Sequence, residues 1–439
     1  MIDTSTAWAH GSTFKVTVTN DNKWQLRSLT GKYVTAENGG GAGLYANRDS
    51  ASGWETFSVQ WVGDNLLNLK SFQGGWVGAN ADVQYASLIS SAAKPDTWEL
   101  FEVVLFRPIR GVNLGSWFVP ENWMVDVYNG SGGDCFCDFV RKVGRNEAET
   151  RIIQHLNSWI VESDFAWLAS QRVNNIRLPI GYWNVINDPY NMYVPVDPST
   201  SFKYIDQAFD WAEKYGITVL LDLHGGPGSQ QGQDHSGCSG SIGWNTPQNH
   251  ELSVKAISSM IQRYGSRPNL YGIELLNEPG WDLEQNNHSD LVSYYQSAYW
   301  EIRKYSESAK VVINCLFGDV IKNSWNSEMS EAQGYHNVLI DMHFYDCFGD
   351  QAHASTGTHI DDAYKWSHDI EYNNQFKPVF VGEWSLATGD NPGGQPFADG
   401  QKYSYSFGIG SYFWNYKLAK DKNNDVWSFR TAIETGWII

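Results

Sequence analysis

The chain has 439 residues, a formal net charge of −18 and 15% aromatic residues, with 21 Trp and 23 Tyr. The length allows two or three domains with a large core, and the acidic charge argues against nucleic acid and anionic membranes as partners, because both bind a basic face. Sugars are neutral and stack on flat aromatic faces, so this composition favours a protein that binds carbohydrate.

Residues 1–106 are predicted to be all-β, because short alternating runs are separated by Gly, Asn and Ser clusters. The segment also repeats: Leu26–Val34 is similar to Leu69–Val77, and Trp54–Val59 is similar to Trp98–Val103. This repeat predicts a four-stranded unit used at least twice, and its pattern resembles fascin-like β-trefoil modules. Two roles remain open for it: binding glycan, or shielding part of the following domain.

From residue 107 onward strands alternate with helices, which is typical of a parallel sheet. The expected strands are Val112–Leu114, Asn175–Pro179, Thr218–Leu223, Tyr271–Leu276, Val311–Asn314, Val338–His343, Val379–Glu383 and Ser411–Trp414. The expected helices are Glu147–Gln171, Tyr204–Tyr215, His250–Tyr264, Leu291–Ser306 and Asp361–Tyr372. Eight strands in about 330 residues predict a (β/α)8 TIM barrel over residues 107–439. A doubly wound sheet is less favoured, because Gly111–Gly115 lacks the GxGxxG pattern.

Polar or aromatic residues end almost every predicted strand of the barrel. These residues are Asn113, Arg177, His224, Asn277, Glu278, His343, Glu383 and Trp414. Because the active site of a TIM barrel lies where its strands end at their carboxyl face, we expect these side chains to form one reaction centre.

The chemistry that two carboxylates on opposite strands suggest is glycoside hydrolysis with retention. Glu278 and Glu383 follow the fourth and seventh strands, which face each other across a barrel. A separation of about 5 Å would let one carboxylate attack the anomeric carbon while the other protonates the leaving oxygen. Arg177 would hold the nucleophile ionised, Asn277 would bond the sugar 2-hydroxyl, and the Tyr345 hydroxyl would support the nucleophile.

Six ordered motifs of this chain resemble glycoside hydrolase family 5, and most closely its exo-β-1,3-glucanase branch. They are Arg110–Phe118 (RGVNLGSWF), Ile176–Trp183 (IRLPIGYW), Leu221–Gln230 (LDLHGGPGSQ), Leu275–Pro279 (LLNEP), His343–Tyr345 (HFY) and Gly382–Trp384 (GEW). The resemblance covers residues 107 to about 429. Plant members of the family also carry a fascin-like module, which fits residues 1–106.

The resemblance implies a role for each residue of the expected site. Glu278 would be the acid/base and Glu383 the nucleophile, surrounded by Arg177, His224, Asn277, His343, Tyr345 and Trp414. Glu121, Trp123 and Asp234 match positions that line the terminal-sugar pocket. Phe348 matches one of two phenylalanines at the pocket mouth, but Gln233 occupies the other position. Because one of the two aromatic rings is missing, this departure argues against a strong preference for a laminarin-like chain.

The leading prediction is therefore an exo-acting β-glucosidase or exo-β-1,3-glucanase on β-glucan or related β-glucosides. An alternative is a rutinosidase-like diglycosidase or an aryl-β-glucosidase acting on glycosylated small molecules, which the altered mouth at Gln233 keeps open. A non-catalytic carbohydrate-binding protein is a third possibility, against which the intact Glu278 and Glu383 argue. No cofactor is expected. Asp222, His224, Asp341 and His343 could suggest a metal, but no spaced ligand motif supports one.

The charge pattern around the two carboxylates also predicts their protonation. Arg177 and the Tyr345 hydroxyl favour the charged form of Glu383. A negative Glu383 should in turn raise the pKa of Glu278 and keep it protonated as the acid. We therefore expect a bell-shaped dependence of kcat/KM on pH, centred on the acid side of neutrality.

The five cysteines include no CxxC pair, so structural zinc is not expected. Cys135 and Cys137 are too close to bridge each other, but either could reach Cys238. The segment Asp134–Asp138 is predicted to be a solvated loop. No apolar run of about 18 residues is present. We expect a secreted monomer, although no signal peptide is visible in this chain.

Overall fold

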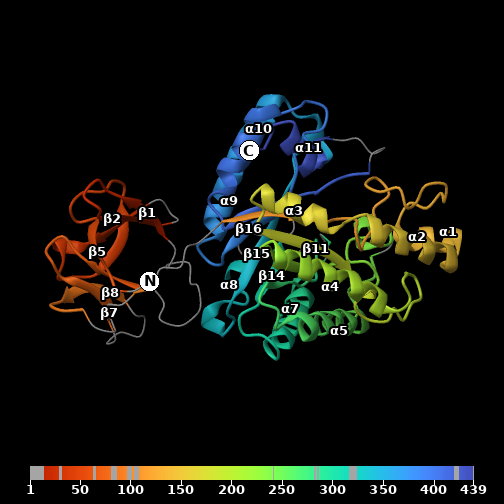
Figure 1. Ribbon diagram of the computed structural model, residues 1–439, viewed down its shortest axis with the longest axis horizontal. Coiled ribbons are helices and arrows are strands. Elements are labelled where there is room, and N and C mark those ends of the chain that lie inside the picture. Colours follow the sequence, from red (N-terminus) through yellow and green to blue (C-terminus); the bar gives the residue numbers. More distant parts are fainter. Residues whose placement is uncertain are drawn as a thin grey trace. The chain divides into compact units, whose positions relative to one another are not determined.

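The computed structural model describes residues 14–28, 32–62, 66–80, 87–95, 101–102, 108–240, 242–280, 283, 286–315, 324–419 and 425–438. The chain forms two compact units, Met1–Arg107 and Pro108–Ile439 (Figure 1). No helix among the described residues is both long enough and apolar enough to cross a membrane.

The described part of the first unit consists of strands and one short 3-10 turn, η2 (Glu37–Gly39), which confirms the predicted β domain. Its described strands are β1 (Phe14–Val18), β2 (Trp24–Ser28), β3 (Tyr33–Ala36), β4 (Leu44–Arg48), β5 (Thr56–Trp61), β6 (Leu66–Lys70), β7 (Trp76–Asn80), β8 (Ser87–Ala92) and β9 (Phe101–Glu102). They form an antiparallel sheet in the order β4-β3-β2-β5-β6-β7-β8, in which β1 pairs with β2 and β9 with β6.

The sequence repeat of this unit is visible in its strands. Leu26–Val34 spans the paired strands β2 and β3, and Leu69–Val77 spans the paired strands β6 and β7. Phe57, Leu67, Leu69 and Val77 pack in its buried core with Ala36. The repeated units therefore share one apolar core. A trefoil and a fascin-like relationship remain predictions.

The second unit contains the predicted eight-stranded parallel barrel. Its strands are β10 (Ile109–Asn113), β11 (Asn175–Gly181), β12 (Thr218–Gly225), β13 (Leu270–Glu274), β14 (Lys310–Cys315), β15 (Val338–Phe344), β16 (Val379–Trp384) and β17 (Gly410–Phe413). Each pairs with the next in parallel, and β17 closes on β10. All eight strands expected from the sequence are confirmed.

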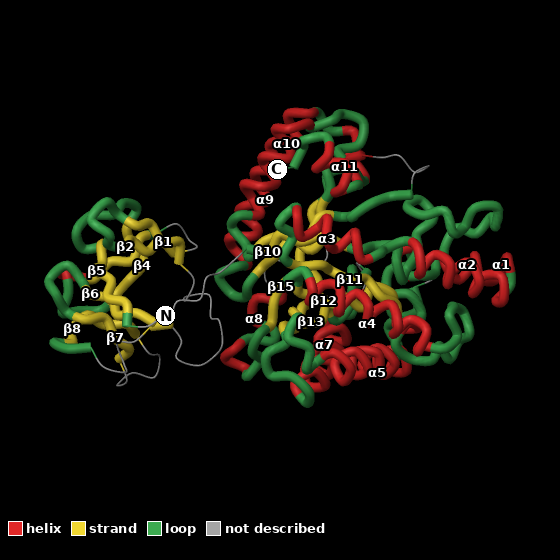
Figure 2. Tube along the Cα trace, viewed as in Figure 1, coloured by secondary structure: helices red, strands yellow, loops and turns green. Residues whose placement is uncertain are grey.

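Helices surround the barrel strands (Figure 2). They are α1 (Phe136–Val143), α2 (Arg145–Ser158), α3 (Glu162–Ser170), α4 (Pro198–Lys214), α5 (Pro247–Tyr264), α7 (His288–Arg303), α8 (Ser324–Ser327), α9 (Thr356–Asn373), α10 (Gly394–Tyr405) and α11 (Phe429–Glu434). Short 3-10 turns lie between them, including η4 (Tyr182–Asn184), η5 (Asp234–Ser236), η7 (Gly349–His353) and η9 (Asp425–Trp427).

Two local predictions are wrong. The helix expected over Glu147–Gln171 is broken into α2 and α3, because the Asp164 carboxylate accepts from the backbone N–H of Val161 at 2.9 Å and starts a new helix. The expected solvated loop at Asp134–Asp138 instead leads into α1. Its Phe136 is fully buried, with its ring 5.8 Å from that of Trp183, and burying an aromatic ring of this size stabilises the helix position by about 1.5–3 kcal/mol.

The barrel interior has an apolar floor beneath a charged layer. Ile109, Leu220, Val312, Leu339, Phe380 and Tyr412 form one buried cluster. Asp222 lies two residues after Leu220 on β12, and Asp341 lies two residues after Leu339 on β15. Residues two apart share one face of a strand, so both carboxylates lie on the same face as the floor residues. The floor therefore closes the end where the strands begin and leaves the polar layer facing the carboxyl ends.

Candidate active site

Arg177 on β11 is the centre of the charged layer, and its side chain is fully buried. Its Nε and Nη2 donate to the two oxygens of Glu274 at 2.7 and 3.0 Å. Nη2 also donates to Asn277 Oδ1 at 2.7 Å, and Nη1 donates to Glu383 Oε1 at 2.8 Å. Asp222 Oδ2 lies 3.0 Å from Nη2. Nη1 also donates to Asn113 Oδ1 at 3.0 Å. A single guanidinium thus contacts five side chains, which come from β10, β12, β16 and from β13 and the segment after it, as its rigid fork of donors allows.

The two predicted catalytic carboxylates meet above this layer. Glu383, at the end of β16, is 5% exposed, and Glu278, in the segment after β13, is 9% exposed. One carboxylate oxygen of each and one ring nitrogen of His343 all lie within 4.8 Å of one another. Glu278 has a positive φ of 38°, a left-handed backbone that a non-glycine residue rarely adopts. Such strain is typical of functional sites.

Tyr345 and His343 complete the contacts of the two carboxylates. The Tyr345 hydroxyl donates to Glu383 Oε2 at 2.9 Å. His343 Nδ1 lies 2.7 Å from Glu278 Oε1 and 3.6 Å from Glu383 Oε2. His343 therefore stands between the carboxylates, while Arg177 and Tyr345 hold Glu383 from the other sides.

The structure reverses the expected order of protonation. Burial acts to raise the pKa of Glu278, but the hydrogen bond and charge of His343 outweigh it and lower this pKa to about 2. Burial raises the pKa of Glu383 against the opposing charges of His343 and Arg177. Burial acts to lower the pKa of His343, but the charges of Glu383 and Asp341 raise it well above its ordinary value. The neighbour that dominates Glu278 is His343 and not Glu383.

We expect His343→Leu to raise the pKa of Glu278 from about 2 to above its ordinary value of 4.5, because burial is then unopposed by the imidazole. Titration of a ¹³C-labelled Glu278 carboxyl by NMR measures this shift. His343→Gln is the matched control, since it retains an N–H donor without the charge, and should give a smaller rise. An unchanged pKa in His343→Leu would show that His343 does not govern Glu278.

His224 and Trp414 form a second wall of the site. The His224 ring stacks on the Trp414 indole with centroids 5.4 Å apart and an interplanar angle of 5°. His224 Nδ1 lies 2.6 Å from Asp222 Oδ2, and its buried Nε2 has no partner among the described atoms. Burial lowers the pKa of His224 well below its ordinary value, so the ring is neutral. Its Nε2 is therefore available to a polar ligand.

The residues expected at the sugar pocket and its mouth lie on the loops above. Trp123 Nε1 donates to Glu121 Oε2 at 2.8 Å, and Glu121 Oε1 is buried without a hydrogen-bond partner among the described atoms. Burial raises the pKa of Glu121 well above its ordinary value, and the nearby Asp234 charge adds to this. Phe348 is 60% exposed, and its ring centroid lies 5.6 Å from that of Tyr345.

Trp427 in η9 was not predicted as a site residue, but it connects this rim. Its ring centroid lies 5.4 Å from Trp123, 5.4 Å from Tyr345 and 6.2 Å from Phe348. Gln233, just before η5, is exposed. The rim thus has an aromatic side. At the position where the resemblance led us to expect a second aromatic ring, the chain carries the exposed polar Gln233.

Two groups of described side chains could offer ligand atoms to a metal ion: Glu274, Asp341 and His343, and Glu278, His343 and Glu383. In the first, the Arg177 guanidinium already lies 2.7 Å from Glu274 and 3.8 Å from Asp341. In the second, the His343 ring bridges the carboxylates. In both groups a cationic side chain supplies the positive charge that buried carboxylates require. That the protein needs no metal remains a prediction.

Glu274 and Asn314 are the buried polar residues that sequence reasoning missed. Glu274 pairs in register with Asp222, and Asn314 pairs with Asp341. Asn314 Nδ2 lies 3.0 Å from His343 Nε2. Glu274 could have been predicted as a site residue, because it is a charged residue within an apolar strand. Nothing in the sequence marks Asn314 until the pairing register of its strand is known.

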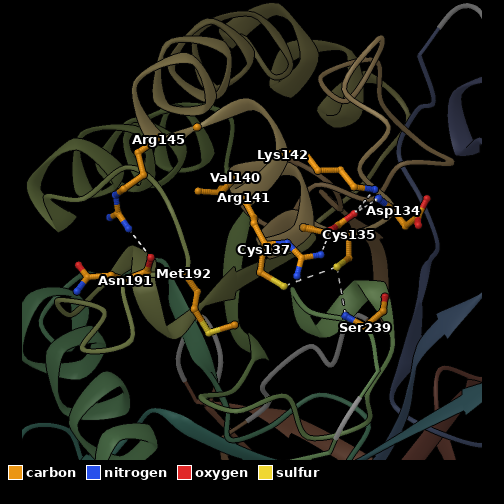
Figure 3. Close-up of a pocket in the computed structure, with 12 residues that line it drawn as sticks. Asp134, Cys135, Cys137, Val140, Arg141, Lys142, Arg145, Asn191, Met192 and Ser239 are labelled. Carbon is orange, nitrogen blue, oxygen red and sulfur yellow. Dashed lines mark hydrogen bonds and ion pairs between the residues drawn. The ribbon is translucent and has the colours of Figure 1, made fainter.

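A separate pocket lies around α1, and none of the predicted site residues lines it (Figure 3). Cys135 and Cys137 face it, and Cys137 forms a disulfide with Cys238. This resolves the alternative that the sequence left open. Cys135 is a buried free thiol whose Sγ accepts from the backbone N–H of Ser239 at 3.3 Å.

Known proteins are similar to this chain in sequence. Glucan 1,3-beta-glucosidase of Blumeria graminis is 37% identical over 292 residues, covering 65% of this chain and 66% of that protein. Glucan 1,3-beta-glucosidase of Pichia angusta is 32% identical over 323 residues, covering 69% and 70%. The chain thus spans about two thirds of the length of these relatives.

Two crystal structures share the fold. AoRut has a TM-score of 0.66 at 23% identity, covering 75% of this chain and 96% of AoRut. The rutinosidase from Aspergillus niger has a TM-score of 0.62 at 19% identity, covering 76% of this chain and 98% of the rutinosidase.

Residues 13–108 match a domain of unknown function. Residues 143–428, more than half of the chain, match the cellulase family, glycosyl hydrolase family 5. The chain therefore belongs to glycosyl hydrolase family 5.

Proposed function

We propose that the protein is a retaining, exo-acting β-glucosidase of the exo-β-1,3-glucanase type. The observation that carries the proposal is the approach of Glu278, Glu383 and His343 to within 4.8 Å of one another. Retaining glycosidases hold their two carboxyl groups about 5–5.5 Å apart, too close for a water to fit between one of them and the sugar. The names of the Blumeria and Pichia relatives support glucan as the substrate.

In the first step, Glu383 attacks the anomeric carbon while the bond to the leaving oxygen breaks. Arg177 and Tyr345 donate to the Glu383 carboxylate and aim it. Glu278 gives a proton to the leaving oxygen and becomes a carboxylate. Before the sugar binds, the proton that Glu278 and His343 share is on His343. The bound sugar excludes water, which favours the uncharged forms of both side chains, and the proton then moves to Glu278.

In the second step, Glu278 takes a proton from water, and the oxygen of that water attacks the anomeric carbon bonded to Glu383. The bond to Glu383 breaks, and the sugar leaves with its original configuration. Asn277, fixed by Arg177 at 2.7 Å, supports the sugar 2-hydroxyl in both transition states. The unpartnered Glu121 Oε1 and His224 Nε2 are available to the other hydroxyls of a terminal sugar.

Substrate choice is tested by comparing laminarin, laminaribiose, gentiobiose, rutin and an aryl β-glucoside, with the anomer of the first product followed by ¹H NMR. We expect glucose to be released from laminarin and laminaribiose as the β-anomer. Release of the α-anomer would contradict retention, and no hydrolysis of any substrate would favour a carbohydrate-binding protein without activity.

A second candidate is a diglycosidase that cleaves glycosylated small molecules. The exposed polar Gln233 at the mouth favours it, because a glucan chain would stack better between two aromatic faces. Cleavage of rutin to release an intact disaccharide, with little activity on laminarin, would select this candidate. Gln233→Phe should then raise the activity on laminarin.

We propose that residues 1–106 form a module separate from the catalytic domain at 107–439, a division supported by the two compact units. A chain that starts at Pro108 is expected to keep its hydrolysis of a small aryl glucoside, because every residue of the candidate site lies beyond it. Activity of the two forms on aryl glucoside and on laminarin measures this. Loss of the fold would show that the module covers apolar barrel surface, and loss on laminarin alone would favour glycan binding.

We also propose that the protein is a secreted monomer. The Cys137–Cys238 disulfide supports an oxidising compartment, where such bonds persist. Light scattering of the purified protein tests the monomer, and a second species of twice the mass would contradict it.

A further inference from the structure

The proposed mechanism leaves one histidine beside the acid/base unused. Glu278 Oε1 is held by His343, and its other oxygen, Oε2, lies 3.5 Å from His235 Nε2. His235 belongs to η5 after β12, and its side chain is 19% exposed. Nε2 of His235 is buried and has no hydrogen-bond partner among the described atoms. The second oxygen of Glu278 is thus an acceptor 3.5 Å from this unpartnered nitrogen.

The surroundings of His235 favour this contact. Its ring lies edge-on to His224, with centroids 6.0 Å apart and an interplanar angle of 72°. The charged and titratable groups around Glu278 are His343 from β15, Glu383 from β16, Asp222 and His224 from β12, and His235, Glu121 and Tyr345 from the loops. A separation of 3.5 Å is long for a hydrogen bond, but catalytic bonds in a free site often tighten only when substrate is bound.

The loop that carries His235 is firmly held. The Cys137–Cys238 disulfide ties it to α1, and the backbone N–H of Cys137 donates to Gly237 O at 3.0 Å. Gly237 has a φ of +92°, and a Cβ there would meet Trp183 at 2.6 Å, so that only glycine fits. Ser236 Oγ lies 2.6 Å from Ser229 Oγ. The position of His235 next to Glu278 is thus set by the fold.

We propose that His235 is a positioning residue that acts through Glu278, donating from Nε2 to Glu278 Oε2 as the carboxyl group loses its proton to the leaving group. This inference rests on the proposed function, in which Glu278 is the acid. His343 lies on the Oε1 side of the carboxyl group. The carboxylate that remains then accepts from His235 at Oε2.

The role predicts a dependence on the leaving group. His235→Phe should lower kcat/KM for laminaribiose by about 10- to 100-fold, the range given by losing a hydrogen bond to a charged group. For the glycosylation step of 2,4-dinitrophenyl β-glucoside, whose leaving group needs little protonation, the rate should change by less than about 3-fold. His235→Gln, which keeps an N–H donor at a similar reach, should recover most of the activity on laminaribiose.

A double substitution separates this role from a general effect on the loop. In the Glu278→Ala background, His235→Phe should cause no further loss of the residual rate on laminaribiose, because the residue through which it acts is gone. Equal losses on both substrates, or fully additive losses in the double variant, would overturn the role of His235 while leaving the proposed function intact. A wild-type protein that hydrolyses neither substrate would instead overturn the proposed function.

Discussion

Glu383→Gln is expected to lower kcat on an aryl β-glucoside by on the order of 10⁶-fold, as the loss of a covalent nucleophile does in other enzymes. The amide cannot form the glycosyl ester, although it fills the same volume. Its oxygen can still accept from Arg177 Nη1, which now lies 2.8 Å from Glu383 Oε1. The fold should therefore be retained, and steady-state kinetics together with circular dichroism measure both effects.

Glu251→Gln is the matched control, because Glu251 is exposed on α5. This variant should keep the full rate. A Glu383→Gln protein that kept more than about one hundredth of the wild-type rate, free of wild-type contamination, would show that another group is the nucleophile.

Arg177→Met is expected to lower the free energy of unfolding by about 3–5 kcal/mol, because it leaves buried carboxylates without their partner. This is a large fraction of the total stability of a typical domain. Glu274 and Asp222 lose their nearest cation, and Glu383 loses the donor that aims it. Activity should be lost as well. Urea unfolding at several pH values measures the stability.

The loss from Arg177→Met should depend on pH. Burial raises the pKa of Asp222 to about 7 and that of Glu274 well above its ordinary value, even with Arg177 present. A carboxyl whose pKa is higher in the folded than in the unfolded protein loses stability as pH rises through that window. Without Arg177 these pKa values rise further, so the deficit should grow as the pH rises above about 7 and should be larger at about pH 9 than at about pH 7.

Arg267→Met is the control for removing an arginine. Arg267 is 31% exposed and pairs with Asp210 and Glu213 at the surface, where an ion pair contributes about 0–1 kcal/mol. A loss from Arg177→Met no greater than that of Arg267→Met would contradict the central role of the buried guanidinium.

Much of this site could be predicted because each β-strand carries its own signal. The apolar runs that end in Asn277–Glu278 and in Glu383 lie at the carboxyl face as expected, and strand order alone brings them together. Glu274 and Asn314 were missed because their role depends on register, which pairs Glu274 with Asp222 and Asn314 with Asp341. Register is a property of two strands and cannot be read from one.

The protonation of the site was predicted incorrectly for a related reason. From the sequence, Glu383 was the obvious charged neighbour of Glu278. In the structure the His343 ring lies 2.7 Å from Glu278 Oε1 and outweighs that charge. Around the start of α1, Asp134 and Asp138 suggested exposure, but Phe136 between them is buried against Trp183. In both cases a tertiary contact overrode the local pattern.

The assignment of Glu278 as acid/base and Glu383 as nucleophile is tested most directly by azide rescue. In Glu278→Ala, an activated aryl glucoside should still glycosylate Glu383, because its leaving group needs little protonation. Azide then fits the space left by the carboxylate and attacks the anomeric carbon from that side. We expect turnover to recover and NMR of the product to show the β-glucosyl azide. Recovery of the α-glucosyl azide would contradict the assignment, since it would mean that the two roles are exchanged or that the reaction inverts configuration.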